Sequence, residues 1–176
     1  RKDIRNAVEA ARNAAGGWSR TSGHARAQIL YYIAENLSAR GAEFAGRIRA
    51  LVGGSAADAG AEVDATVRRL FSYAAWADKW DGAVHHVPIR GVALAMNEAI
   101  GVVAVAAPDE SPLLGFVSTV APLLATGNAV VVVPSVSHAP SATDIYTVFE
   151  SSDVPGGAVN IVTGAKDVLA KTLAEH

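Results

Sequence analysis

Residues 101–134, GVVAVAAPDESPLLGFVSTVAPLLATGNAVVVVP, decide the fold of this 176-residue chain. The stretch opens with one apolar run, 101–106, and closes with another, 129–133. Runs of this length are typical of strands that are buried on both faces of a parallel sheet. Only two charged residues, Asp109 and Glu110, interrupt the stretch. We therefore expect it to form the buried centre of an α/β domain.

The segment between these two runs is predicted to be a helix. Ser111-Pro112 supplies an N-cap followed by a first-turn proline, and Gly127 supplies a stop. Pro122 is expected to kink the helix. Asp109 and Glu110 precede the helix, where we expect them to cap it and to interact favourably with the positive end of its dipole. The alternative is an acid/base pair or a cation site, since open α/β sheets bind ligands at this edge.

The remainder of the carboxyl-terminal half repeats this pattern. A third apolar run covers 158–162, and helices are expected at 141–151 and 165–174. The segment 89–95 has the small and β-branched residues of a short edge or hairpin strand. We therefore predict a β-α-β core over 88–176 that forms a Rossmann-like open parallel sheet flanked by helices.

Helical patterns occupy the amino-terminal half, residues 1–82. The first helix is expected to begin near Asp3 and to end at Gly16-Gly17. A long second helix follows from about residue 29 to 51, and a third carries its apolar face over 63–77. Three helices thus precede the strands, and all 176 residues are interpreted as one domain or one large piece of a domain.

Composition excludes several classes of function. The net charge of -2, without a run of Lys or Arg, argues against a nucleic-acid partner. The absence of cysteine removes disulfides, thiolate metal sites and cysteine nucleophiles from this chain. No apolar stretch reaches membrane-spanning length and no signal-peptide pattern is present, so a cytoplasmic location is expected. The start at Arg1, without Met, suggests a segment of a longer polypeptide.

Four strings resemble the aldehyde dehydrogenase superfamily, with matching spacing between them. They are AVEAARNAAGGWS at 7–19, GVVAVAAPDESPLL at 101–114, VAPLLATGNAVVVVP at 120–134 and DVPGGAVNIVTG at 153–164. The resemblance covers essentially the whole chain and implies the first part of the family's cofactor-binding domain. It is strongest to the degenerate second module of double-module aldehyde dehydrogenases, which lacks the essential cysteine.

The resemblance also implies that the catalytic and cofactor contacts are degraded. Active members read Pro-Trp-Asn-Phe-Pro after the first core strand, and the Asn amide helps to hold the oxyanion. This chain keeps Pro108 and Pro112 but has Glu110 at the Asn position, and a carboxylate has no hydrogen to donate to a developing negative charge. Loss of one such donor costs about a hundred- to a thousand-fold in rate. We therefore expect no catalytic residue and no metal site in this chain.

Two further contact sets are altered. Active members present Lys-Pro-x-Glu after the second core strand, where Lys and Glu bind the cofactor's ribose hydroxyls. Here Pro134 is kept, but Val133 and Val136 replace both polar anchors. The turn Thr163-Gly164 matches the family, whereas two later glycines near the pyrophosphate are replaced. The replacements are Lys166 and Ala170.

These differences predict a non-catalytic module with a structural or assembly role inside a larger NAD-dependent aldehyde dehydrogenase. No cofactor is expected on this chain, NAD is expected for the parent enzyme, and the partners are the rest of the parent and other copies in a homo-oligomer. One alternative is a fragment of an active NAD(P)-dependent enzyme whose catalytic residues lie outside this chain. Another is a small-molecule binding module with an altered pocket. Because the chain stops after the third core strand, at least one sheet edge is expected to lack its usual partner.

Three residue pairs allow other interpretations. Adjacent His85-His86 on a strand point to opposite faces, which disfavours a metal site. His138 beside Ser137 suggests a serine hydrolase, but the chain has no Gly-x-Ser-x-Gly motif. Trp76 and Trp80 lie one helical turn apart, where packing in a core or interface is favoured over ligand stacking.

Overall fold

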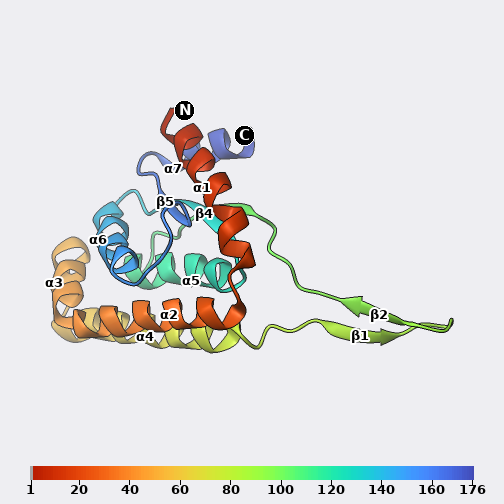
Figure 1. Cartoon of the computed structure of the whole chain (residues 1–176). Coiled ribbons are helices and arrows are strands. Elements are labelled where there is room, and N and C mark those ends of the chain that lie inside the picture. Colours follow the sequence, from red (N-terminus) through yellow and green to blue (C-terminus); the bar gives the residue numbers. More distant parts are fainter. Residues whose placement is uncertain (1) are drawn as a thin grey trace.

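A computed structural model describes residues 2–176, so Arg1 of the expected helical segment lies outside the described residues. The described chain forms one body of helices around a small sheet, with a thin arm projecting from it (Figure 1). The start of α1 and helix α7 lie side by side at the top of the view. The helices are α1 Lys2–Arg20, α2 Gly23–Ala39, α3 Gly41–Val52, α4 Ala56–Ala77, α5 Pro112–Ala125, α6 Ala139–Glu150 and α7 Lys166–Ala174. The strands are β1 Ala83–His86, β2 Val92–Ala95, β3 Val102–Ala106, β4 Ala129–Val133 and β5 Val159–Ile161.

The three predicted apolar runs form a parallel sheet in the order β3-β4-β5. Val131 of the central strand lies opposite Ala104 on one side and opposite Asn160 on the other. Helices α5 and α6 make the crossovers between consecutive strands. The Rossmann-like, open parallel sheet flanked by helices is therefore confirmed.

Burial differs between the strands, which corrects one expectation. All five residues of β4 have 0% exposure, as predicted for a strand covered on both faces. In contrast, Ala104 and Ala106 of β3 are exposed and the other residues of that strand are only partly buried. The reason is position, because β3 and β5 are the edges of the described sheet. The segment 101–134 is thus buried in β4 and α5 but not in β3.

Different helices cover the two faces of the sheet. On one face, α1 packs through Ile4, Val8 and Ala11 against Ala129 and Val131. On the other face, α5 and α6 pack against β4 and β5, and α2 and α4 form the next layer. Alternate residues of each strand therefore enter two separate apolar clusters, as the strand geometry requires.

The amino-terminal segment contains four helices where three were predicted. Helix α1 continues through Gly16-Gly17 to Arg20, so the prediction of its end was wrong. Trp18 is 2% exposed in the main core, and burial of this large side chain outweighs the weak helix preference of the two glycines. The predicted second helix is divided at Arg40 into α2 and α3.

Strands β1 and β2 form an antiparallel hairpin, which we call the arm (residues 83–95), outside the body (Figure 1). The predicted strand at 89–95 is correct only for its second half, since 87–91 form the connection at the tip. Strand β1 was not predicted. All eight residues of the two strands are exposed, and an isolated two-stranded hairpin is at best marginally stable in water.

Candidate functional site

The carboxyl ends of the three parallel strands meet at one edge of the sheet. Loop 107–111 leads from β3 into α5, loop 134–138 leads from β4 into α6, and loop 162–165 leads from β5 into α7. Every position that the resemblance marked as catalytic or cofactor-binding lies in or directly beside these loops, except Ala170, which lies within α7. This edge is also where open α/β sheets bind ligands.

Four polar side chains from these loops contact one another, and we call them the loop-edge cluster: Asp109, Ser135, His138 and Lys166. The Lys166 Nζ donates to Asp109 Oδ1 at 3.0 Å. The Ser135 hydroxyl lies 3.3 Å from His138 Nδ1 and is also hydrogen bonded to the Asp109 carboxylate. Hydrogen bonds from Lys166 and Ser135 lower the pKa of the Asp109 carboxyl below its ordinary value.

Asp109 and Glu110 do not cap α5, so that prediction was wrong. The first turn of α5 is capped instead by Glu62 of α4, whose Oε1 accepts from the amides of Leu113 at 2.9 Å and Leu114 at 3.2 Å. Ser111 makes no side-chain cap bond; with φ of 48°, it turns the chain into the helix. Nothing in the sequence near Glu62 indicates this contact, because the two groups are about fifty residues apart and meet only when α4 packs on α5.

Pro108 packs against the start of α5, and Glu110 is exposed. A Cβ added at Gly115 would lie 2.7 Å from Cγ of Pro108 and 2.8 Å from the Glu110 carbonyl oxygen. A glycine at this position therefore allows the loop to fold back onto the helix. By the resemblance, Glu110 stands where the family pattern has an amide donor.

Val133 and Val136, the residues at the two ribose-anchor positions, differ in their exposure to solvent. Val133 is 0% exposed and Pro134 is buried, whereas Val136 is 56% exposed. Neither valine has a polar side-chain atom that could bind a hydroxyl group. Ser135, between them, was missed by the sequence analysis, although its spacing of three residues from His138 is a weak signal for contact at a helix start.

The last four positions lie in the loop after β5 and in helix α7, which follows it. Thr163 and Gly164 are exposed, and a Cβ at Gly164 would lie 2.9 Å from Leu169 Cδ1. Lys166 and Ala170 are partly buried in α7. The Lys166 side chain, at a position where the family pattern has glycine, reaches across the sheet edge to Asp109.

The loop-edge cluster does not have the arrangement of a serine hydrolase. In a catalytic triad, histidine lies between serine and the carboxylate, whereas here Ser135 lies between His138 and Asp109. The Ser135 residue is also only 3% exposed, which hinders access by a substrate. The cluster thus connects three loops and offers no activated nucleophile. His138 contacts Ser135, where the sequence analysis had considered Ser137.

Two other expectations concern residues outside this edge. His85 and His86 lie on the exposed strand β1 of the arm. Within residues 2–176, no group of three or more His, Cys, Asp or Glu side chains is placed to hold a metal ion. The same residues include no helix that is both long enough and apolar enough to cross a membrane.

Comparisons with known proteins agree with this architecture. The model of the aldehyde dehydrogenase family matches residues 1–176. The chain is 30% identical to alpha-ketoglutaric semialdehyde dehydrogenase of Bacillus subtilis, with 99% of the chain aligned to 36% of that protein. It is 33% identical to hydroxyisobutyraldehyde dehydrogenase of Mycolicibacterium austroafricanum, with 99% aligned to 34%.

Solved structures give the same result. The fold matches betaine aldehyde dehydrogenase of Staphylococcus aureus in complex with NAD+ at a TM-score of 0.94 and 26% identity, over 99% of this chain and 36% of that one. The chain thus spans little more than a third of the length of its relatives. On the match of the family model to its whole length, the chain belongs to the aldehyde dehydrogenase family.

Proposed function

We propose that this chain is a non-catalytic module with a structural or assembly role inside a larger NAD-dependent aldehyde dehydrogenase. One observation carries the proposal. At the edge of the sheet where a dinucleotide would bind, Val133 and Val136 stand at the ribose anchors while Lys166 is tied to Asp109 across the strand ends at 3.0 Å. On this proposal the cluster holds the strand ends together, and the two valines leave the ribose hydroxyls without polar anchors.

The chemistry of aldehyde oxidation supports the same conclusion. Formation of a thiohemiacetal needs a thiolate, and the chain has no cysteine. Stabilisation of the oxyanion needs hydrogen-bond donors, and the loop after β3 presents Glu110 instead. A dehydrogenase reaction therefore requires residues that other parts of the parent protein would supply. We place the parent, with NAD as its cofactor, in the cytoplasm.

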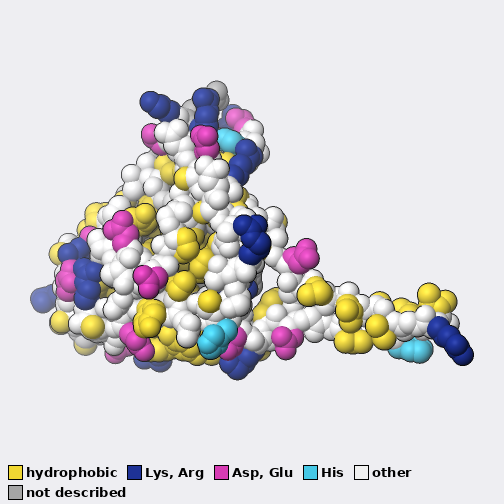
Figure 2. All heavy atoms as spheres, viewed as in Figure 1, with side chains coloured by type: hydrophobic (Ala, Val, Ile, Leu, Met, Phe, Trp, Pro, Cys, Tyr) yellow, Lys and Arg dark blue, Asp and Glu magenta, His cyan; other side chains and the backbone are white. Residues whose placement is uncertain are grey.

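An assembly role is supported by the distribution of exposed apolar side chains (Figure 2). Thirteen large hydrophobic side chains are exposed in the described chain, and eight of them lie between residues 76 and 100. These eight are Trp76, Trp80, Val84, Ile89, Val92, Leu94, Met96 and Ile100. Exposed apolar side chains gathered in one part of a molecule mark a protein interface, so we assign the arm and its base to contacts within a homo-oligomer of the parent.

A second candidate is the fragment of an active enzyme, which the coverage of 36% of a relative's length favours. The two candidates differ in whether this edge of the sheet becomes part of an active site. For the fragment candidate, the rest of the enzyme would complete an active site at this edge. The sequence of the whole parent distinguishes them, since a non-catalytic module predicts a second, intact module with the catalytic cysteine.

Calorimetric titration with NAD tests the proposal directly. The wild-type chain is expected to give no binding up to about millimolar NAD, because the ribose contacts are absent and each tenfold in affinity corresponds to about 1.4 kcal/mol. The comparison is a variant carrying Val133→Lys, Val136→Glu, Lys166→Gly and Ala170→Gly together, which is expected to recover weak binding. A stoichiometric micromolar site on the wild-type chain would contradict the proposal.

A further inference from the structure

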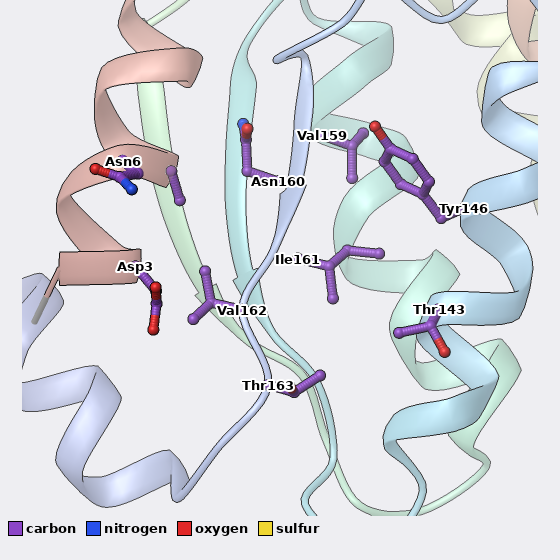
Figure 3. Close-up of a pocket in the computed structure, with 10 residues that line it drawn as sticks. Asp3, Asn6, Thr143, Tyr146, Val159, Asn160, Ile161, Val162 and Thr163 are labelled. Carbon is purple, nitrogen blue, oxygen red and sulfur yellow. The ribbon is translucent and has the colours of Figure 1, made fainter.

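A groove runs along the outer edge of β5, on the side of the strand away from β4 (Figure 3). Its volume is about 560 Å³. Helix α1 forms one wall, helix α6 forms the other, and the floor is β5 with the residues that follow it. The wall residues are Asp3, Asn6, Ala7, Thr143 and Tyr146, and the floor is 159–163. None of these residues belongs to the loop-edge cluster.

The backbone of β5 has hydrogen-bonding groups that face this groove. The amide of Val130 donates to the carbonyl of Ala158 at 2.8 Å, and the amide of Val162 donates to the carbonyl of Val132 at 3.0 Å. Because the backbone groups of a strand alternate in direction, residues 158, 160 and 162 face β4. The backbone N–H and C=O groups of Val159 and Ile161 therefore face the groove, where they form an unpaired strand edge.

The groove can hold a strand but little else of regular structure. Side chains of β5 and of the residue after it point to different walls: Val159 and Ile161 point towards α6, whereas Val162 points towards α1 (Figure 3). The edge of the strand is thus recessed between two helices, and an extended polypeptide is the element whose own backbone groups match it. A helix has no free backbone donors along its length and would leave the β5 groups unsatisfied.

The charge of the groove specifies the occupant further. Asp3 is the charged side chain among the residues that line it, and no Lys, Arg or His lines it. Asp3 lies beside the carboxyl end of β5, near Val162 (Figure 3). A basic residue at that end of the bound segment would be attracted to this carboxylate. Antiparallel pairing, which is slightly more stable per residue than parallel pairing, places the basic residue at the amino end of the segment.

We propose that the groove between α1 and α6 binds an extended polypeptide segment with a basic residue near its amino end, which adds to the sheet as an antiparallel strand beside β5. The backbone of Val159 and Ile161 provides the hydrogen bonds, and Asp3 contacts the basic side chain. This proposal is independent of whether the chain binds NAD, so failure of one leaves the other standing.

Amide hydrogen exchange of the 176-residue chain, measured by NMR, tests the proposal. The probe is the peptide acetyl-Arg-Val-Thr-Val-Thr-Val-amide. At millimolar peptide, exchange at Val159 and Ile161 is expected to slow by about tenfold, which corresponds to the gain of one or two hydrogen bonds. Exchange at Asn160 and Val162, whose amides already face β4, is expected to stay unchanged. Absence of slowing at millimolar peptide would overturn the proposal.

Two controls separate strand pairing from general stickiness. The same peptide with N-methyl groups on alternate residues keeps its side chains but loses its donors on one edge, and it is expected to leave exchange at Val159 and Ile161 unchanged. Asn6→Trp fills the groove and is expected to abolish the effect of the unmodified peptide. Asn13→Trp, two turns further along the same face of α1 and outside the groove, is expected to preserve it. Equal protection by the methylated peptide, or in Asn6→Trp, would contradict strand addition.

Discussion

Strands β4 and β2 have similar sequences and opposite surroundings. Strand β4 reads AVVVV and has 0% exposure at every residue, whereas β2 reads VALA and is exposed at every residue. Both are short, apolar and free of charge. The difference arises from their neighbours. Strand β4 lies between β3 and β5 and is covered by helices on both faces, whereas β2 pairs with β1 alone in a two-stranded sheet. Apolar composition predicts that a strand will be covered, but not by which molecule.

The largest expected effect comes from placing a charge in each strand. Val132→Asp puts an unpaired carboxylate at a fully buried position, which costs more than about 4 kcal/mol and is expected to prevent folding. Leu94→Asp in β2, at 65% exposure, is expected to change the free energy of unfolding by less than about 0.5 kcal/mol. Urea unfolding followed by circular dichroism measures both. Val132→Ala serves as the control and is expected to fold with a loss of about 2 kcal/mol. Equal stability of the two Asp variants would remove the distinction between the strands.

The next effect concerns what covers the arm. Val84 and Leu94 lie opposite each other in the hairpin and so share one face. Changing both to Thr keeps the preference for a strand but removes apolar surface, and self-association of the chain is expected to weaken by about tenfold or more. Sedimentation velocity over a range of concentrations measures this. The matched control is Ala83→Thr with Ala95→Thr, the opposite pair on the other face. An unchanged distribution of species in the first variant would show that this face is not an interface.

A smaller effect is expected from weakening α5, the helix that covers β4. Glu62→Ala removes the acceptor for the first amides of α5, a helix that packs on β4. Loss of a helix cap costs about 1 kcal/mol, and amide exchange in β4 is expected to accelerate while the arm is unaffected. Glu62→Gln retains an acceptor oxygen and is expected to lose less. Equal rates of amide exchange in β4 in the wild type and in Glu62→Ala would show that this cap does not stabilise the packing of α5 on β4.

The smallest expected effect is the pH dependence at the end of β3. Lys166 and Ser135 lower the pKa of Asp109 in the folded state. The stabilisation by this carboxylate is therefore present above its unfolded pKa, near about 4, and is lost as the pH falls through the lower folded value. The difference in melting temperature between wild type and Asp109→Asn should be small at pH 7 and should vanish once the pH falls below the folded pKa of Asp109. A difference that grows on acidification would contradict the contact with Lys166.

Local sequence determined the elements that depend on periodicity. The apolar runs at 101–106, 129–133 and 158–162 became β3, β4 and β5 within a residue or two, because a parallel strand and the helix after it are specified by neighbouring residues. The resemblance to the family placed the altered positions Glu110, Val133 and Lys166 at one edge of the sheet.

Tertiary structure alone decided the contacts between distant segments. Asp109 and Glu110 precede α5 in the sequence, yet Glu62 caps this helix, and Asp109 bonds to Lys166 and Ser135. Burial of Trp18 extends α1 beyond two glycines that locally favour the end of a helix. In each case the stabilisation comes from burial or from a hydrogen bond between residues far apart in the chain. Local sequence patterns do not specify which distant group will make the contact. For the same reason the exposure of the arm and the groove beside β5 became visible only when the helices were placed around the sheet.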